Sequence, residues 1–266
     1  MHERERHRII VSAVQGKPVV TVGELVELIG VSEATVRRDI AALDLEQRLR
    51  RVRGGAEALH PPQRGNLAGR PFSVNDSLHV AEKAAIAREA VALIEDDDDI
   101  IVNGGTTTFH MVPLLAQCRV HVLTNSFPVA AQLLEHSHVD VAIVGGAIYR
   151  EQRIVLSPGP NDSADAFCAR RMFMSAHGVG RHGLMESDPR VVQSERSLME
   201  RADELIVLAD SSKFKCRTPL VLCPLERVDV LITDEGISDA SLAMLEAAAV
   251  RVVIARMSDK ELRSTG

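Results

Sequence analysis

A stretch without periodicity divides this chain and constrains its fold more than any other feature. Residues 60–71 read His-Pro-Pro-Gln-Arg-Gly-Asn-Leu-Ala-Gly-Arg-Pro, with three prolines and two glycines, a composition typical of connectors. The chain has 266 residues, which is more than one compact domain of ordinary size usually needs. We therefore predict a small domain over 1–60, a linker over 61–77, a larger domain over 78–257 and a tail over 258–266.

The small domain is predicted to hold three short helices and then a hairpin. Apolar residues recur at helical spacing in three groups, which are Ile10, Ala13 and Val14; Leu25, Leu28 and Ile29; and Val36, Ile40 and Leu43. Thr21 and Glu24 have the spacing of a capping box. Only Gly30-Val31 separates the second group's helix from the third. Because a glycine can end a helix in the left-handed conformation, this is the pattern of a helix-turn-helix.

Basic and hydroxyl side chains gather after this corner. The first two turns of a recognition helix contact base edges and phosphates, and four arginines in six residues then lead into Gly54-Gly55. A glycine turn within Leu49–Leu59 predicts a two-stranded wing. The candidates for DNA binding are Ser32, Thr35, Arg37, Arg38, Arg50, Arg51 and Arg53. A helical hairpin without a nucleic-acid role, and a solvated charged face, are the alternatives.

The larger domain alternates short apolar runs with helical stretches rich in Ala and Leu. Runs that are apolar on both faces are typical of a parallel sheet covered by helices. The runs are Ile100–Val102, Val120–Leu123, Val139–Val144, Leu205–Leu208, Val228–Ile232 and Val250–Ile254. The predicted fold class is therefore α/β, with a winged helix-turn-helix in front of it.

Polar turns follow several of these runs. In an open α/β sheet, ligands bind beyond the carboxyl ends of the strands, and free amides in a glycine-rich turn favour an anion. The candidates for such a site are Gly104, Gly105, Thr106, Thr107, Thr108, Asn125, Ser126, Asp210 and Lys213. The alternatives are that the two glycines serve only tight packing and that the lysine is solvated.

The chain resembles a known family at these same positions. Ser32–Ile40, Leu43 and Arg53–Ala56 are similar to the winged helix-turn-helix of the DeoR family of bacterial transcriptional regulators, and the resemblance covers nearly all of residues 3–257. The resemblance implies that the second domain is similar to ribose-5-phosphate isomerase in fold. It also implies that this domain senses a phosphorylated sugar or a related sugar metabolite.

Three departures from the family pattern bear on the ligand. Family members often read Asp-x-Ala-Phe-x-Gly-x-Asp-Gly, whereas this chain has Arg170 and His177 where the two acids would stand, and Glu195 where a lysine is usual. The resemblance makes these three residues candidates for effector binding, with a ligand of different charges and hydroxyls. Leu156–Pro158 and Met172–Phe173 are similar to the subgroup that contains the L-ascorbate-utilisation repressor.

Charge and composition limit the function. The net charge of −6 divides into ten basic and nine acidic residues over 1–60, and 21 and 28 over the rest, so a local arginine cluster and not the overall field favours DNA. That balance excludes an architectural DNA binder. No apolar run approaches the roughly 18 residues of a membrane span, the N-terminus has no export signal, and the four cysteines form no CxxC pair.

These observations predict a cytoplasmic DNA-binding protein, and the family resemblance implies that it is a repressor of carbohydrate-utilisation genes. Its expected partners are operator DNA, a sugar-phosphate or sugar-acid effector and further copies of itself, with no membrane. No enzymatic activity, cofactor or metal is expected, and the acidic run Asp96–Asp99 is interpreted as a solvated turn and not as a cation site. A sugar-phosphate isomerase with an accessory DNA-binding head is the alternative function.

Overall fold

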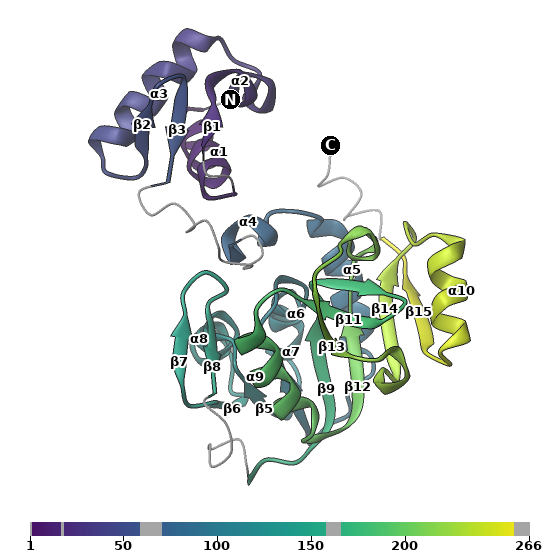
Figure 1. Cartoon of the computed structure of the whole chain (residues 1–266). Coiled ribbons are helices and arrows are strands. Elements are labelled where there is room, and N and C mark those ends of the chain that lie inside the picture. The colour runs from purple at the N-terminus through teal and green to yellow at the C-terminus, as the bar shows by residue number, and fades with distance from the viewer. Residues whose placement is uncertain (1, 17–18, 59–70, 158–165, 258–266) are drawn as a thin grey trace. The chain divides into compact units, whose positions relative to one another are not determined.

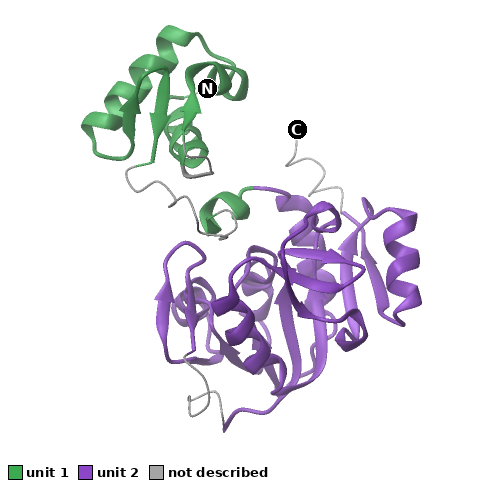
Figure 2. Ribbon diagram, in the orientation of Figure 1, with its two compact units in different colours: residues 1–77 green, residues 78–266 purple. Residues whose placement is uncertain are grey.

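The chain forms two compact units, residues 1–77 and 78–266, in a computed structural model (Figure 2). The structure describes residues 2–16, 19–58, 71–157 and 166–257. Pro158, most of the expected linker and the expected tail 258–266 lie outside these ranges. The expected linker nevertheless contributes one short helix, α4 (Phe72–Asp76), to the first unit, where it contacts the first helix of the chain.

The first unit is a winged helix-turn-helix (Figure 1). Its remaining elements are α1 (Glu3–Gly16), β1 (Val20–Thr21), α2 (Val22–Ile29), α3 (Glu33–Leu45), β2 (Arg50–Val52) and β3 (Gly55–Glu57). The three strands form one sheet in the order β1-β3-β2, with β3 antiparallel to both neighbours. The predicted helix-turn-helix and wing are therefore confirmed.

The turns of this unit follow from local chemistry. The capping box is present, because Thr21 Oγ1 accepts from Glu24 N at 3.2 Å and Thr21 N donates to Glu24 Oε2 at 2.8 Å. Gly30 ends α2 in the left-handed region, with φ 71°. Gly54 takes φ 84° in the wing turn. A Cβ on Gly55 would lie 2.1 Å from the carbonyl oxygen of Val20, so the close approach of β3 to β1 requires glycine.

One apolar cluster holds the first unit together. Its fully buried members include Ile10, Val14, Leu25, Val36, Leu43 and Leu49. The expectation for Leu28 was wrong, since its side chain is 59% exposed. The eight-residue helix α2 buries Val22, Leu25 and Ile29 instead, and a position three residues after Leu25 lies at the edge of that face.

The second unit is an α/β domain. Its helices are α5 (Val80–Val91), α6 (Thr106–Phe109), α7 (Val112–Leu115), α8 (Phe127–His136), α9 (Pro189–Met199), α10 (Asp239–Ala247) and the 3-10 helices η2 (Ser211–Lys215) and η3 (Leu225–Arg227). Its strands are β4 (Asp98–Val102), β5 (Val120–Thr124), β6 (Asp140–Ile143), β7 (Ala147–Tyr149), β8 (Ile154–Leu156), β9 (Ala169–Ser175), β10 (Gly178–Gly180), β11 (Gly183–Glu186), β12 (Ala202–Leu208), β13 (Leu220–Cys223), β14 (Val230–Asp234) and β15 (Arg251–Ala255).

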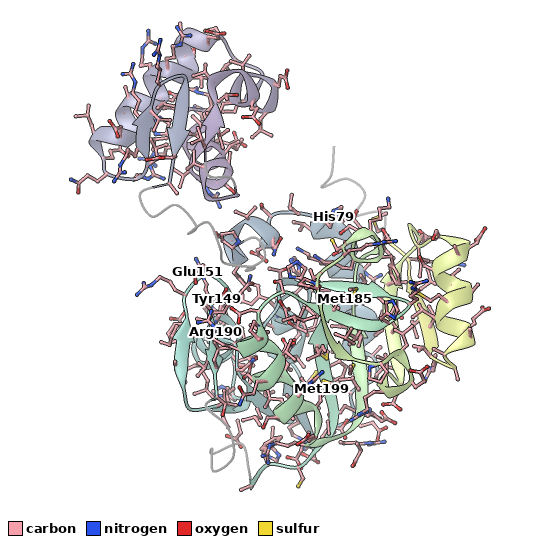
Figure 3. The ribbon with its side chains drawn as sticks, viewed as in Figure 1. His79, Tyr149, Glu151, Met185, Arg190 and Met199 are labelled. Carbon is pink, nitrogen blue, oxygen red and sulfur yellow. The ribbon has the colours of Figure 1, made fainter. Side chains whose placement is uncertain are left out.

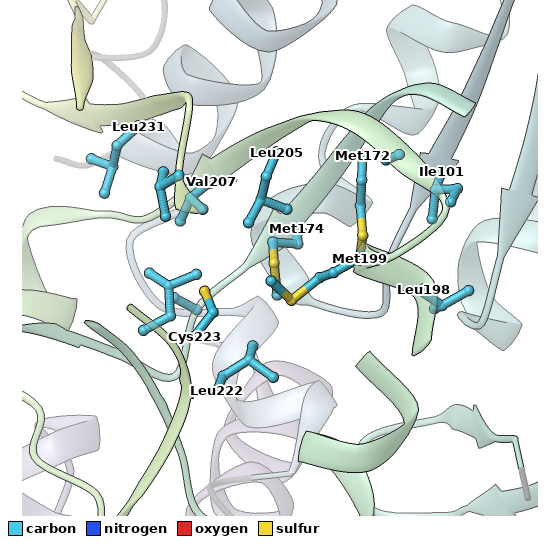
Figure 4. Packing of buried hydrophobic residues seen from close by; sticks show 14 of the residues in the cluster. Ile101, Met172, Met174, Leu198, Met199, Leu205, Val207, Leu222, Cys223 and Leu231 are labelled. Atoms are coloured by element: carbon cyan, nitrogen blue, oxygen red, sulfur yellow. The ribbon is translucent and has the colours of Figure 1, made fainter. Parts of the chain in front are cut away.

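Seven of these strands form one parallel sheet in the order β15-β14-β12-β9-β4-β5-β6. Apolar clusters cover both faces: Leu205 and Val207 of β12 pack into one (Figure 4), and Ile206 and Leu208 pack into the other. The predicted parallel α/β class is confirmed, and each of the six predicted runs overlaps a strand. The seventh strand, β9, lies at the centre of the sheet.

The order of the strands reverses next to β9. From β4 the chain adds β5 and β6 on one side, and it then returns to add β9, β12, β14 and β15 on the other. The carboxyl ends of β4 and β9 therefore meet at a topological switch point, which is where open α/β sheets bind ligands. Two smaller sheets, β7-β8 and β10-β11-β13, complete the unit.

Candidate functional site

The exposed side of α3 carries the residues predicted to read DNA. Ser32 caps the helix, with its Oγ 3.3 Å from Thr35 N and 2.9 Å from Thr35 Oγ1. Arg37 and Arg38 are both exposed, and Arg37 forms a 2.8 Å ion pair with Glu33 one turn earlier. Arg38 forms no ion pair with any other described residue, so its guanidinium is available to a partner.

The inner side of α3 is anchored by an ion pair that the sequence analysis missed. The buried carboxylate of Asp39 accepts from Arg6 of α1 at 2.7 and 3.1 Å, and His7 Nε2 lies 3.4 Å from it. Burial opposes ionisation of Asp39, but the hydrogen bonds and charge of Arg6 outweigh it and lower the pKa of this carboxyl. The signal in the sequence was an acid at a helical position between Val36 and Ile40.

The wing carries the other predicted arginines. Arg50 lies 3.3 Å from Glu57 of β3, and Arg48 lies 3.2 Å from Glu46. The backbone of Arg51 donates to Asp44 at 2.9 Å, which ties β2 to the end of α3. The side chains of Arg51 and Arg53 are exposed and form no ion pair within the described part of the chain. These two cations are therefore available to a phosphate backbone.

In the second unit, the turn after β4 lies at the switch point. Asn103 is fully buried, and its Oδ1 accepts from Ser175 N at the end of β9 at 3.0 Å. Gly104 N donates to Asn125 Oδ1 at 2.6 Å, which joins the turn to the end of β5. Thr108 Oγ1 donates back to Asn103 O at 2.9 Å. The turn is therefore held rigidly by its polar neighbours.

The two glycines of this turn are required by close packing. A Cβ on Gly104 would lie 2.0 Å from Ile154 Cγ2 of β8, and a Cβ on Gly105 would lie 2.3 Å from Ser175 Oγ. This is the packing role considered as the alternative for Gly-Gly. This packing role does not extend to the three threonines that follow. Thr106 begins α6, and Thr107 and Thr108 are buried.

Asn125 and Ser126 follow β5 at the same edge. Ser126 caps α8, with its Oγ 3.4 Å from Val129 N. Asn125 is fully buried, and its Nδ2 has no hydrogen-bond partner among the described residues. An unpaired buried donor of this kind lowers the stability of the fold. A ligand oxygen that accepted a hydrogen bond from this amide would remove that cost.

Asp210 and Lys213 follow β12. Asp210 is buried and caps η2, accepting from Ser212 N at 3.1 Å, and its Oδ2 lies 4.0 Å from Lys213 Nζ. Lys83 of α5 is also fully buried, and α5 contacts α6, the short helix that begins at Thr106. Lys83 is not among the residues singled out from the sequence, although a lysine within the Ala-rich stretch of a buried helix is itself a signal of function.

Glu195 reaches the switch point from α9. Its carboxyl is buried and accepts from Asn103 Nδ2 at 2.9 Å. Burial raises its pKa well above the ordinary value, the nearby Glu186 raises it further, and the hydrogen bond from Asn103 opposes the rise. Glu186 itself lies 3.7 Å from His177 Nδ1. Burial opposes its ionisation, but His177 and the Ser187 amide outweigh burial and lower its pKa.

The structure corrects the expectation for Arg170. It is the second residue of β9 and thus lies at the amino edge of the sheet, opposite the switch point. Its guanidinium is 2.7 Å from Glu95 and 3.1 Å from Asp98. The family alignment, matched at Phe173, placed Arg170 among the effector candidates. Arg170 comes three residues before Phe173, which puts it roughly 10 Å further from the carboxyl end of the strand.

The same amino edge corrects the interpretation of Asp96–Asp99 as a solvated turn. Asp96 and Asp97 are exposed, but Asp98 is buried and pairs with Arg171 as well as Arg170. A groove of about 660 Å³ lies at this edge, at the amino ends of β4, β5 and β6. Its lining residues include Arg119, His121 and His138. It is remote from the switch point. Within the described ranges, no cluster of His, Cys, Asp and Glu side chains is arranged to hold a metal ion.

A further pair of side chains joins the start of α9 to β7. The guanidinium of Arg190, at the start of α9, lies over the ring of Tyr149, 4.9 Å from its centre (Figure 3), and 2.6 Å from Asp188. Burial, with the charges of Asp188 and Glu151, raises the pKa of Tyr149 to about 12.

None of the helices among the described residues is both long and apolar enough to span a bilayer.

Comparison with known proteins places both units in one family. Residues 6–61 match the model of the DeoR-like helix-turn-helix domain, and residues 78–235 match that of the DeoR C terminal sensor domain. The HTH-type transcriptional regulators UlaR of Shigella dysenteriae serotype 1 (strain Sd197) and Escherichia coli (strain K12 / DH10B) are each 32% identical to this chain over 253 residues. Each match covers 95% of this chain and 99% of the relative.

Solved structures resemble the chain more distantly. Ribose 5-phosphate isomerase A of Methanocaldococcus jannaschii is 20% identical with a TM-score of 0.37, over 49% of this chain and 52% of that one. The eIF2B beta chain of Chaetomium thermophilum is 15% identical with a TM-score of 0.40, over 87% and 81%. At these scores neither likeness bears on function.

Proposed function

Because the chain belongs to the DeoR family of transcriptional regulators, we propose that it represses carbohydrate-utilisation genes and leaves its operator when a phosphorylated sugar metabolite binds. It is a DNA-binding regulator and not an enzyme. Such a regulator acts on chromosomal DNA, so the cytoplasm is its proposed compartment. The proposal depends on one observation: the first unit contains both the helix α3, with exposed polar and basic side chains, and a wing with exposed arginines.

The DNA contacts follow from the exposure of these side chains. Ser32, Thr35 and Arg38 lie at the start of α3, where side chains of a recognition helix reach base edges. Arg51 and Arg53 of the wing, with Arg37 and Arg50 beside them, supply positive charge to phosphates. The ion pairs of Arg37 with Glu33 and of Arg50 with Glu57 must open or reorient for contact with DNA.

Helix-turn-helix proteins bind half-sites with matching two-fold symmetry. We therefore propose that the chain binds DNA as a homodimer or a larger homo-oligomer. An effector then acts by linkage, because it favours a subunit arrangement whose heads no longer fit the half-site spacing. Sedimentation of the free protein and of its DNA complex tests this point.

The proposed effector site is the carboxyl edge of the sheet around the switch point. The supporting features are the buried polar side chains there and the turn Gly104–Thr108, with Lys83 and Lys213 as cations for an anionic group. Asn125, Ser126, His177, Glu195 and Asp210 complete the proposed site. Arg170 is not part of it, because it lies at the opposite edge of the sheet.

A gel-shift titration tests the function. The full-length protein is incubated with the DNA upstream of its own gene, and pentose and hexose phosphates and sugar acids are added in turn. We expect specific binding and release by a phosphorylated member of the panel. Absence of specific DNA binding would refute the regulator assignment, and binding without release by any member would refute the effector class.

A further inference from the structure

The Glu195 carboxyl is fixed at the switch point. It is 5% exposed, and it is held by a 2.9 Å hydrogen bond from Asn103, whose other side-chain atom accepts from Ser175 N. The residue lies on the inward face of α9, which also buries Val191, Val192 and Leu198. The carboxyl therefore cannot swing away to avoid a ligand group placed beside it.

A second acid lies near this carboxyl. Glu186, the last residue of β11, lies near enough to raise the pKa of Glu195 by its charge. A negative ligand group here would meet repulsion that a buried site screens poorly. Any ionised form of Glu195 would add to that repulsion.

The nearby cations are already committed to other partners. Arg196, next along α9, donates to the carbonyl oxygens of Leu222 and Val221 at 2.7 and 2.8 Å and so faces β13. Arg190 is paired with Asp188, and His177 lies 3.7 Å from Glu186. These three cations are therefore not free to neutralise a carboxylate placed beside Glu195.

A neutral donor is attached to the same turn as Asn103, the partner of Glu195. Asn125 Oδ1 accepts from Gly104 N, directly after Asn103, while its buried Nδ2 lacks a partner among the residues described. A single amide donor suits a hydroxyl or carbonyl oxygen, and the Glu195 carboxyl suits a hydroxyl that can both donate and accept. Together they match an uncharged polyol better than an anion.

Resting on the proposed function, we propose that the effector presents an uncharged, hydroxyl-bearing end to Glu195 and Asn125, and not a carboxylate. The anionic group of the effector is then a phosphate bound at the turn Gly104–Thr108. The proposed ligands are therefore phosphates of uncharged sugars. Glu195 is the residue that discriminates them from phosphorylated sugar acids.

The test uses pairs of ligands that differ only at the carbon distant from the phosphate. Glucose 6-phosphate is compared with 6-phosphogluconate, and ribose 5-phosphate with 5-phosphoribonate. For each, the concentration that releases half of the full-length protein from its DNA is measured, with thermal shift of the free protein as a second readout. The variants are Glu195→Gln and Glu195→Lys, and Glu186→Gln serves as a control for the second acid.

For at least one pair, the wild type is expected to respond to the neutral sugar at a concentration at least tenfold lower than to the acid. Glu195→Lys should reverse this order, and Glu195→Gln should fall between the two. Tighter binding of the acids to the wild type, or a ratio unchanged in both variants, would overturn the inference alone. If no pair acts on the wild type while DNA binding is intact, the proposed effector class fails and the inference falls with it.

Discussion

Two buried carboxyl groups, one in each unit, show how a single residue's surroundings decide its charge. Asp39 is buried against Arg6, and the pair lowers its pKa. Glu195 is buried against an amide and near another acid, so its pKa is raised. The two groups should therefore make the stability of the protein depend on pH in opposite directions.

Asp39→Asn should destabilise the protein most at neutral pH. A carboxyl with a lowered pKa contributes stability above its unfolded value of about 3.9 and loses that contribution as the pH falls through the folded value. Calorimetry of the full chain from pH 3 to 7 should show the difference in melting temperature shrinking towards acid. A difference that stays constant across this range would contradict the assigned ion pair.

Glu195→Gln should behave in the opposite way. A carboxyl with a raised pKa stabilises the fold below its unfolded value of about 4.3, and this stability is lost as the pH rises through the folded value. Melting curves from pH 5 to 8 should therefore show that the melting temperature of the glutamine variant rises relative to that of the wild type as the pH rises. Glu186→Gln is the matched control, since the lowered pKa of Glu186 predicts that its difference from the wild type stays constant over this range and changes only below the unfolded value of about 4.3.

At the scale of elements, local signals were the most predictable. The capping box, the glycine that ends α2 and the wing turn each depend on a few adjacent residues, and each was found as expected. The central strand β9 is absent from the six apolar runs because Arg170 and Arg171 stand near its start, although Arg171–Met174 itself indicates the core of a strand. Asp98, Glu95 and Glu204 neutralise these arginines, and that pairing across distant segments leaves no local signal.

The position of the candidate site was only partly predictable. Turns after apolar runs indicated the carboxyl edge correctly for Asn125 and Asp210, because parallel strands end together. Arg170 was misplaced since a family alignment gives residue identity but not which end of a strand a residue occupies. The Asn103–Glu195 hydrogen bond joins residues 92 positions apart, and no spacing pattern covers that distance.

The wing should contribute affinity without specificity. Arg51→Ala should weaken binding to every DNA sequence and lower the slope of log affinity against log salt by about 1, because it removes one available phosphate contact. Arg48→Ala is the matched control, and its pairing with Glu46 predicts a smaller change. Gel-shift titrations over a range of salt concentrations measure both. Equal losses in the two variants would show that pairing does not distinguish these arginines.

The recognition helix should contribute specificity. Arg38→Ala should cost about 1–3 kcal/mol at particular base pairs, whereas Arg37→Ala, which removes a residue paired with Glu33, should act more evenly. Binding to a library of single-base operator variants separates the two patterns. A uniform loss for Arg38→Ala would assign that residue to phosphates.

At the scale of the whole molecule, the chain combines two units with separate apolar cores. The sequence predicts a division near the Pro-rich stretch and shows a charge imbalance between the two parts. The acidic second unit repels the duplex while the arginines of the first attract it. Weak non-specific binding and a strong dependence on the right operator are the expected consequence.

The central claim is that one molecule reads DNA with its first unit and releases it when the second binds a phosphorylated sugar. The most direct measurement is the affinity of the full-length protein for the DNA upstream of its own gene, with and without sugar phosphates. We predict specific binding that at least one sugar phosphate weakens tenfold or more, and that its unphosphorylated sugar leaves unchanged. Specific binding that no sugar phosphate alters would contradict the account.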